Sequence, residues 1–435
     1  MRMKEAGTLL VLDTWKEAPH MRATSLLRTL IALKHTRITG FEFTDLGIEV
    51  GVAPSTRVPY CSGCLCRARH VYDHRAREWR HLDFAGMKVT LKYWQRRVDC
   101  RRCGGVRIEL VPWAEPDSDF TRDFEDQVAY LAQVTDQTTV MKLMRISWKT
   151  VGTIAQRVVA RLGPADRLDG LEYIGIDELS YRRHHEYVTT VVDHVATKVV
   201  WAAPGKSADT VAGFFEDLGP ERAAKLKVVT MDMSAAYITA VEKGAAQARI
   251  VFDRFHVQRM AQDAVDQVRR EQVRLLAGSD DAKTLKKTRW ALLKNPWNLS
   301  AVEKGKLVDV QRENRPLYRA YLLKETLADI LGGRQINVAR DRLQDWTSWA
   351  AHSRLAPLKK LATTIRDHIE GILAFIATGL TNATIEGING KIRVITRRVY
   401  GFHSATSLIS FIFLCCTGLV LSPILKMPDL HPLHD

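Results

Sequence analysis

The chain has 435 residues, of which 46% are hydrophobic and 26% charged, so it is neither a disordered nor a collagen-like chain. Its length allows more than one domain with a buried core. Lys and Arg number 64 against 49 Asp and Glu, which gives a net charge of +15. A balance this basic favours a polyanionic partner, above all nucleic acid, because cations that neutralise phosphates release counterions. A solvated basic surface without a partner is the alternative.

The first part of the chain is expected to hold a metal rather than disulfides. No secretory signal is recognised at the N-terminus, so we expect a reducing cytoplasm, where close cysteines are metal-ligand candidates. Residues 1–57 read as a short helix followed by alternating strand residues, after a start without a recognisable pattern. A basic module follows over residues 58–113.

Two CxxC knuckles in this module supply four thiolates: Cys61, Cys64, Cys100 and Cys103. Four thiolates in two pairs suit tetrahedral Zn²⁺ and leave no open coordination position. The sequence therefore predicts a zinc ribbon with structural zinc. Four further side chains stay open as substitute ligands: Cys66, His70, His74 and His81.

A helical region is predicted after the ribbon. Pro, Asp and Ser accumulate over residues 112–121, which predicts a linker. Over residues 121–165 the pattern becomes helical in three pieces, and Ser147 can cap the third. Two short helices with a tight turn before a third are typical of a helix-turn-helix DNA-binding domain. A plain helical connector fits the periodicity equally well.

Residues 170–256 read as strand-strand-strand-helix-strand-helix-strand. Asp177 comes at the end of the first strand and Asp232 at the end of the fourth. If a parallel fourth strand follows three antiparallel strands, both carboxylates reach one edge of the sheet. Adjacent acids need a cation between them, and two Mg²⁺ or Mn²⁺ ions can clamp the oxygens of a phosphodiester. Three other acids compete for the same role: Glu178, Asp193 and Asp253.

The remaining chain is predicted to be largely helical. Residues 257–380 look helical and polar. Residues 408–425, "LISFIFLCCTGLVLSPIL", are long and apolar enough for a membrane span, but their Ser, Thr, Gly and Pro favour a buried core helix. We therefore expect no membrane partner, and a short C-terminal tail over residues 426–435.

A basic stretch over residues 381–402, "TNATIEGINGKIRVITRRVYGF", holds a single acid, Glu386. Asn382, Asn389 and Arg393 follow helical spacing from it and share its face. A carboxylate on a helix can complete a metal site that two strands begin. The amides and cations of this helix are candidates for contacts to DNA: Asn382, Asn389, Lys391, Arg393, Arg397 and Arg398. A solvated polar face is the alternative.

Together these motifs resemble a known family. The strand order with "GIDELS", "VVTMDMSAAY", "FDRFH" and the stretch over residues 381–402 is similar to the DDE transposases of bacterial insertion sequences, and more narrowly to the ISL-three family. "VYDHRAREWRHLDF" and "VPWAEPDSDFT" resemble the front end of that family. The resemblance extends from Arg37 to Phe413.

The resemblance implies a multidomain α+β protein. An RNase H-like α/β catalytic core would occupy residues 170–256 and 381–425, interrupted by an all-helical insertion over residues 257–380. The catalytic, magnesium-binding acids of the family map onto Asp177, Asp232 and Glu386. A DxxH-like element maps onto two supporting residues, Asp253 and His256.

The resemblance also implies a function. The protein would bind the terminal inverted repeats of an insertion sequence as double-stranded DNA, cleave a strand with Mg²⁺, and transfer the 3′-OH end into target DNA. A homodimer or higher homo-oligomer in the bacterial cytoplasm, associated with the nucleoid, is expected. Two alternatives remain: a catalytically silent DNA-binding regulator derived from a transposase, and a metal-dependent nuclease without joining activity. The intact acid triplet argues against the first, and strand-transfer products would exclude the second.

Overall fold

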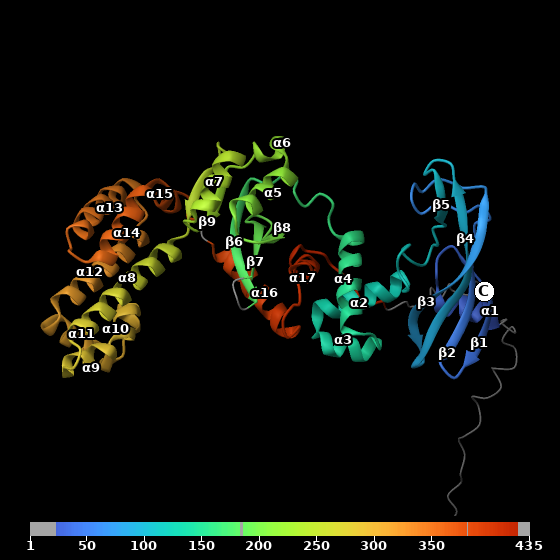
Figure 1. Ribbon diagram of the computed structural model, residues 1–435, viewed down its shortest axis with the longest axis horizontal. Coiled ribbons are helices and arrows are strands. Elements are labelled where there is room, and N and C mark those ends of the chain that lie inside the picture. The colour runs from blue at the N-terminus through green and yellow to red at the C-terminus, as the bar shows by residue number, and fades with distance from the viewer. Residues whose placement is uncertain (1–22, 183–185, 381, 425–435) are drawn as a thin grey trace, which may run out of the picture. The chain divides into compact units, whose positions relative to one another are not determined.

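The computed structural model describes residues 23–182, 186–380 and 382–424 (Figure 1). The expectations for the first twenty residues and for the tail over residues 426–435 lie outside these described residues. The chain divides into two compact units, Met1–Val158 with Val420–Asp435, and Val159–Leu419.

The first unit combines a five-stranded sheet with helices, as the sequence predicts. Its elements are α1 (Ala23–Ile31), β1 (Thr36–Thr44), β2 (Gly47–Pro54), β3 (Val71–Phe84), β4 (Met87–Cys100), β5 (Gly105–Ile108), α2 (Arg122–Val134), α3 (Gln137–Met144) and α4 (Trp148–Leu162). The strand order is β1-β2-β4-β3, with β5 beside β4. Only the pairing of β2 with β4 is parallel among the described strand pairs of this sheet.

Alternation along β2 builds the core of this unit. Ile48, Val50 and Val52 are buried, and the residues between them are half-exposed. Trp79 packs edge-to-face on Trp113, with ring centroids 5.5 Å apart. The core thus holds a residue from the segment over 112–121.

The prediction of a linker over residues 112–121 is wrong in this respect. Trp113 and Ser118 are buried, and Arg77 donates hydrogen bonds to the Pro116 and Ser118 carbonyls and pairs with Asp119. The Pro, Asp and Ser content does mark irregular backbone, but a tryptophan anchors that backbone in the core.

The three predicted helical pieces over 121–165 are present as α2, α3 and α4. Thr121 and Asp136 cap the first two, and the Ser147 hydroxyl accepts the Thr150 N–H at 3.2 Å before the third. Buried Glu125 of α2 pairs with Arg157 of α4 at 2.7 Å. The helices therefore form one packed group and not a plain connector.

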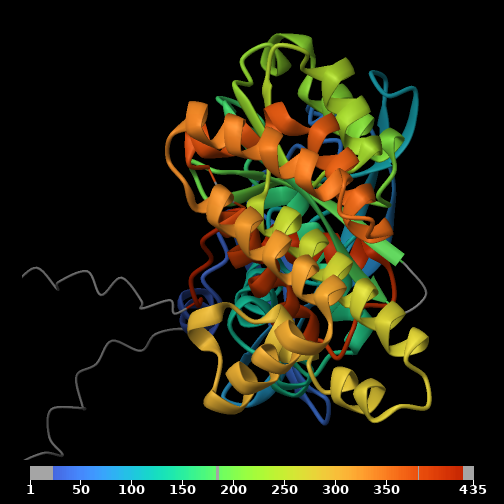
Figure 2. The same ribbon diagram turned by 90° about the vertical axis from the view of Figure 1, so that its left-hand side faces the viewer.

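The second unit contains a second sheet and a long helical segment (Figures 1 and 2). Its elements up to the last strand are β6 (Tyr173–Arg182), β7 (Glu186–Asp193), β8 (Lys198–Pro204), α5 (Ala208–Leu218), α6 (Pro220–Ala223), β9 (Val228–Met231), α7 (Ala235–Gly244) and β10 (Arg249–Phe252). The predicted order is confirmed, apart from the short α6. The sheet order is β10-β9-β6-β7-β8. β6, β7 and β8 are antiparallel, whereas β9 and β10 run parallel to β6.

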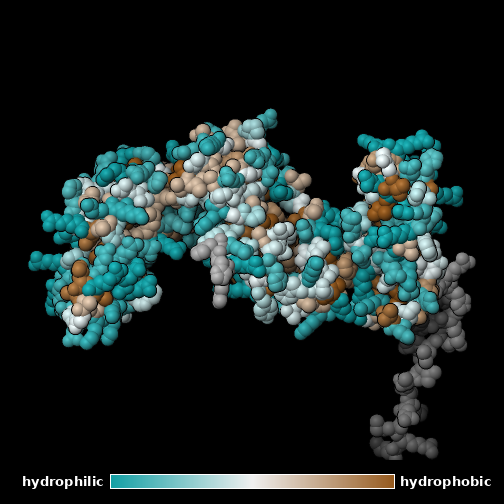
Figure 3. Space-filling model, viewed as in Figure 1, coloured by the Kyte–Doolittle hydropathy of each residue, from teal (hydrophilic) through white to brown (hydrophobic). Residues whose placement is uncertain are grey.

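The helices that follow are α8 (Arg254–Leu275), α9 (Asp280–Lys286), α10 (Arg289–Leu293), the 3₁₀ turn η1 (Pro296–Asn298), α11 (Ala301–Glu313), α12 (Arg315–Gly332), α13 (Ile336–Ala351), α14 (Ala356–Asp367), α15 (Ile369–Thr378), α16 (Ala383–Arg398) and α17 (Ala405–Cys416). From α8 to α15 the described chain is helical without a strand, as predicted for residues 257–380. Its visible surface is mostly hydrophilic (Figure 3).

The two faces of the second sheet have different helices. Ile174 and Ile176 of β6 pack in one core with α5 and α7. α16 contacts β6, and α17 contacts β7 and β8. Since successive strand residues point to opposite faces, Gly175 and Asp177 lie on the α16 face.

The first half of the apolar C-terminal stretch is a core helix, whereas residues 417–424 are not helical. α17 ends at Cys416 and buries Leu408, Phe411 and Ile412. Among the described residues no single helix is long and apolar enough to cross a membrane; α15 and α16 reach that length only together, and they are bent by 92° at the break between them.

Candidate active site and zinc site

The four knuckle cysteines come together in the first unit. Sγ of Cys61 lies 3.7 Å from Sγ of Cys103, and Sγ of Cys64 lies 3.5 Å from Sγ of Cys100. Four sulfurs around a zinc ion at Zn–S distances of about 2.3 Å would be roughly 3.8 Å apart. The cluster therefore has the donors and the spacing of a tetrahedral Zn²⁺ site, as predicted.

The substitute ligands lie outside this cluster. Cys66 Sγ accepts a hydrogen bond from Arg102 Nη1 at 3.0 Å. His81 is buried, with Nδ1 2.8 Å from the Thr121 hydroxyl, and His70 and His74 are exposed. Among the described residues the four knuckle thiols are the one group of possible ligands with three or more atoms all within 4.8 Å of one another. Cys66 thus lies outside the cluster and contacts Arg102 instead.

The second candidate site lies at one edge of the second sheet. β6 and β9 are parallel neighbours, and Gly175 pairs with Thr230. Asp177 and Asp232 each follow two residues later, at equivalent positions. Phe252 of β10 pairs with Met231, so Asp253 follows at the same edge. The register thus places Asp177 and Asp232 at one edge of the sheet, with Asp253 following β10 there, but among the described residues the three carboxylates do not form a group with all ligand atoms within 4.8 Å of one another.

Asp177 does not end its strand, contrary to the sequence-based expectation. β6 continues past Asp177 to Arg182, because it pairs with the longer β7 beyond the point where β9 ends. Asp177 therefore stands on a rigid, paired backbone, whereas Asp232 lies just beyond the last residue of β9.

The carboxylate of Asp177 is held by two donors. Oδ1 accepts the Glu178 N–H at 2.8 Å, and Oδ2 accepts Nδ2 of Asn389 at 2.6 Å. Burial raises the pKa of Asp177, the two hydrogen bonds oppose this, and the neighbouring Asp232 charge adds to the rise. A cation at this edge would favour the ionised form.

Glu178, which the sequence leaves open as an alternative metal ligand to Asp177, has a different environment. It follows Asp177 directly, so its side chain leaves the opposite face of β6. There Tyr237 of α7 donates a hydrogen bond to it. Burial raises its pKa, with Asp232 and Asp177 adding to the effect. In the backbone register of β7 and β8, Asp193 lies opposite Lys198, next to the turn that joins the two strands. This position is outside the edge of the sheet that Asp177 and Asp232 share.

Asp253 and His256 lie at the start of α8. Asp253 is 2% exposed and caps the helix: Oδ1 accepts the Phe255 N–H at 3.2 Å. His256 Nε2 is 4.0 Å from Asp253 Oδ2. Burial raises the pKa of Asp253, His256 lowers it, and Glu386 raises it further. Glu386 of α16 is exposed, and among the described residues it does not form a ligand group with Asp177 and Asp232 that has all atoms within 4.8 Å of one another.

On α16 and its N-cap, the asparagine side chains are buried and the charged side chains are exposed. Asn382 and Asn389 are 3% and 5% exposed, whereas Glu386, Lys391, Arg393, Arg397 and Arg398 are exposed. The expectation that the asparagines lie beside the cations on an open face therefore differs from the structure. The reason is that residues three and four positions apart cover a wide arc of the helix surface, and one side of this arc packs on β6. The role of the exposed cations in DNA binding stays a prediction.

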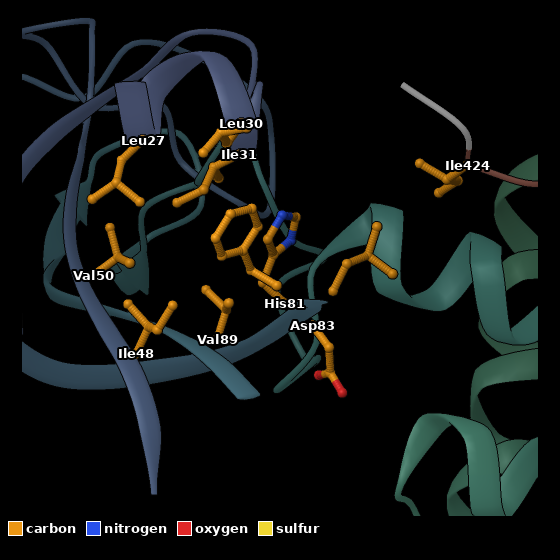
Figure 4. Close-up of a pocket in the computed structure, with 11 residues that line it drawn as sticks. Leu27, Leu30, Ile31, Ile48, Val50, His81, Asp83, Val89 and Ile424 are labelled. Atoms are coloured by element: carbon orange, nitrogen blue, oxygen red, sulfur yellow. The ribbon is translucent and has the colours of Figure 1, made fainter. Parts of the chain in front are cut away.

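A cavity of about 190 Å³ in the first unit lies apart from these carboxylates. Figure 4 shows apolar side chains of α1, β2 and β4 pointing into it, with Ile424 at its far margin. Its polar residues have partners: His81 lies against Thr121, and Asp83 pairs with Arg80 and Arg145. We therefore do not consider it an active site.

Comparisons with known proteins show the family of the chain. A family model described as "Transposase" matches residues 174–412, which is more than half of the chain. Over 432 aligned residues the chain is 37% identical to a transposase for insertion sequence element IS1557 of Mycobacterium tuberculosis, covering 92% of the chain and 96% of the relative. The chain belongs to the ISL3 family of transposases.

Two further models and a second relative support the front end of this ISL3 transposase. A zinc-finger model of transposases matches residues 57–103, and the helix-turn-helix model of the ISL3 family matches residues 109–159. A transposase for insertion sequence element IS1001 of Bordetella parapertussis is 32% identical over 82% of the chain and 88% of its own length. The zinc ribbon and helix-turn-helix expected from the sequence are confirmed.

Two contacts near the acids were not predicted from the sequence. One is the hydrogen bond between Asn389 and Asp177, which are 212 residues apart. The other is His194, whose Nε2 lies 2.8 Å from the Thr230 hydroxyl beneath the acid edge. The position of Asn389, three residues after Glu386, can be read from the sequence, but its hydrogen-bond partner depends on the fold.

Proposed function

We propose that this chain is a DDE-type transposase that binds the terminal inverted repeats of an insertion sequence, cleaves there, and joins the end to target DNA. The observation that carries the proposal is the placement of Asp177 and Asp232 at equivalent positions of adjacent parallel strands, facing the helix that bears Glu386. A protein that only binds DNA has no need for acids in this arrangement.

The sheet supports an RNase H-like core. Three antiparallel strands followed by two parallel strands, with helices on both faces, match the architecture that the family resemblance implies. The helices from α8 to α15 run between the last strand and α16, as a helical insertion between the second and third acids would.

The acid edge suits divalent cations. Oδ1 of Asp232 and Oδ2 of Asp253 are buried and accept no hydrogen bond from the described residues. Burial and mutual repulsion raise the pKa of Asp177, which a cation would reverse. Asp177, Asp232 and Glu386 would hold two Mg²⁺ or Mn²⁺ ions, with Asp253 and His256 supporting them. When bound, such ions supply Lewis-acid activation of water or a 3′-OH and stabilise charge on the phosphodiester.

The residues of the chain would position the DNA. Exposed Arg393 and Arg397 follow Glu386 along α16 and would contact phosphates beside the reacting one. Lys391, which donates a hydrogen bond to the Cys415 carbonyl, would join them. The zinc ribbon and the helix-turn-helix would bind the inverted repeat, and a homodimer would bring two ends together. No nucleophilic side chain is required, since water and then the 3′-OH attack phosphorus directly.

Transfer of a labelled element-end duplex into a plasmid tests this function. Wild-type protein with Mg²⁺ should give cleaved and joined products, and Asp177→Asn, Asp232→Asn and Glu386→Gln should each lose both while still binding the duplex. Glu242→Gln, on α7, serves as a matched control that keeps activity. Full activity of any of the three variants would remove that residue from the catalytic set, and cleavage without joining would indicate a nuclease.

A further inference from the structure

Asn389 has a different role from the cations that follow it on α16. Its side chain is 5% exposed, and Nδ2 donates to Oδ2 of Asp177 at 2.6 Å. This distance is short for an N–H···O bond, as expected when the acceptor is a carboxylate. Arg393, by contrast, is exposed. The Asn389 amide group is therefore engaged inside the protein and does not reach a DNA phosphate.

A second contact, one helical turn earlier, docks the same helix on the same strand. Ile385 is fully buried, and a Cβ built on Gly175 of β6 would lie 2.1 Å from Ile385 Cδ1. Gly175 and Asp177 lie on one face of β6, and Ile385 and Asn389 on one face of α16. The two contacts fix both the rotation and the height of the helix against the strand.

Glu386 lies between these contacts along the helix. Because Ile385 and Asn389 are fixed, the side chain of Glu386 leaves α16 in a defined direction, at the margin of the packed face. Loosening of the Asn389 contact would release Asp177 and Glu386 together.

We propose that Asn389 is a positioning residue that orients Asp177 and locks α16 so that Glu386 is presented to the same edge. This inference rests on the proposed function of the acids. It replaces the expectation that Asn389 contacts DNA. The second oxygen of Asp177 is held by the Glu178 N–H, so Asn389 completes the fixation of a carboxylate that would otherwise rotate.

Three variants and a control separate a positioning role from a DNA contact. Asn389→Ala removes the donor, Asn389→Asp keeps the size but cannot donate when ionised, and Asn389→Gln keeps a donor with a longer reach. Arg393→Ala, one turn further along α16 and exposed, is the matched control for a DNA contact. Each protein is measured for melting temperature, duplex affinity, Mn²⁺ affinity by electron paramagnetic resonance, strand-transfer rate at saturating duplex, and hydrogen exchange of α16.

Asn389→Ala and Asn389→Asp should bind the duplex within about twofold of wild type, since the amide makes no DNA contact. Their Mn²⁺ affinity should fall by about 10-fold or more and their strand-transfer rate at saturating duplex by about 100-fold. Asn389→Gln should recover part of both, and exchange of α16 should be faster in the Ala and Asp variants only. Arg393→Ala should show the reverse pattern, with weaker duplex binding and unchanged Mn²⁺ affinity.

The inference is overturned if Asn389→Ala weakens duplex binding as Arg393→Ala does and leaves Mn²⁺ affinity and α16 exchange unchanged. Unchanged values in every measurement would overturn it equally. If wild-type protein shows neither Mn²⁺ binding nor strand transfer, the proposed function fails, and exchange of α16 still decides whether Asn389 locks the helix.

Discussion

The close approach of α16 to β6 makes Gly175→Ala a sharp test of how the site is built. A methyl group there would lie 2.1 Å from Ile385 Cδ1, 2.8 Å from the Thr230 hydroxyl and 2.9 Å from His194 Nε2. All three distances are well below van der Waals contact, and neither Ile385 nor Thr230 has open space to move into, because both are buried. Gly175 is therefore required for packing and not for an unusual backbone conformation.

Overpacking of a buried site costs about 1–3 kcal/mol, and more where neighbours cannot move. For a unit of this size that corresponds to a fall of roughly 2–12 °C in melting temperature. The strand-transfer rate should fall by more than the loss of folded protein at the assay temperature explains. The reason is that α16 carries both Asn389 and Glu386, so a shifted helix displaces both side chains. Differential scanning calorimetry and the strand-transfer assay measure the two effects.

Gly387 provides a control on the same helix. No atom lies within 4 Å of a Cβ built there, so Gly387→Ala should raise stability by about 0.5–1 kcal/mol. Ile385→Ala alone should destabilise by about 2–5 kcal/mol. Combined with Gly175→Ala it should cost less than the sum, because it removes the clashing atom. Wild-type stability of Gly175→Ala, or strict additivity in the double variant, would refute the packing argument.

Two further predictions concern other parts of the chain. The Cys100→Ser variant should lose bound zinc, measured by atomic absorption, and should bind the duplex more weakly. The Cys66→Ser variant should keep the zinc, because Cys66 lies outside the cluster. Equal zinc content in the two variants would contradict the assigned ligands. Burial lowers the pKa of His194 below its ordinary 6.5, so its contribution to stability is present above that pH and is lost as the pH falls through the folded-state pKa. The urea midpoint of wild type should therefore drop below pH 6.5, and His194→Gln should show a smaller drop; parallel curves would argue against this assignment.

The sequence was sufficient where local patterns determine the fold. The order of strands and helices predicts that the first and fourth strands of the second sheet are neighbours, and this places Asp177 beside Asp232. The CxxC spacing likewise predicts the zinc cluster, although it could not choose between four thiols and nearby substitutes. That choice depends on the folded backbone, in which Cys66 lies against Arg102.

The rest depended on packing between distant segments. Nothing near Asn389 shows that it hydrogen-bonds a residue 212 positions away. Helical spacing groups Asn389 with Glu386 and Arg393, but it does not tell which of them faces the sheet. The composition of residues 112–121 similarly predicts irregular backbone correctly, but burial of Trp113 there depends on Trp79 of another segment.

The most direct test of the catalytic assignment supplies an element end that is already cleaved, with a free 3′-OH, and measures its joining to plasmid DNA. This step isolates the transfer chemistry from recognition and first cleavage. Wild-type protein should join the end with Mg²⁺ and not without a divalent cation, and Asp232→Asn should bind the same end with unchanged affinity and join none of it. Joining by Asp232→Asn at the wild-type rate would contradict the assignment of the acid edge as the active site.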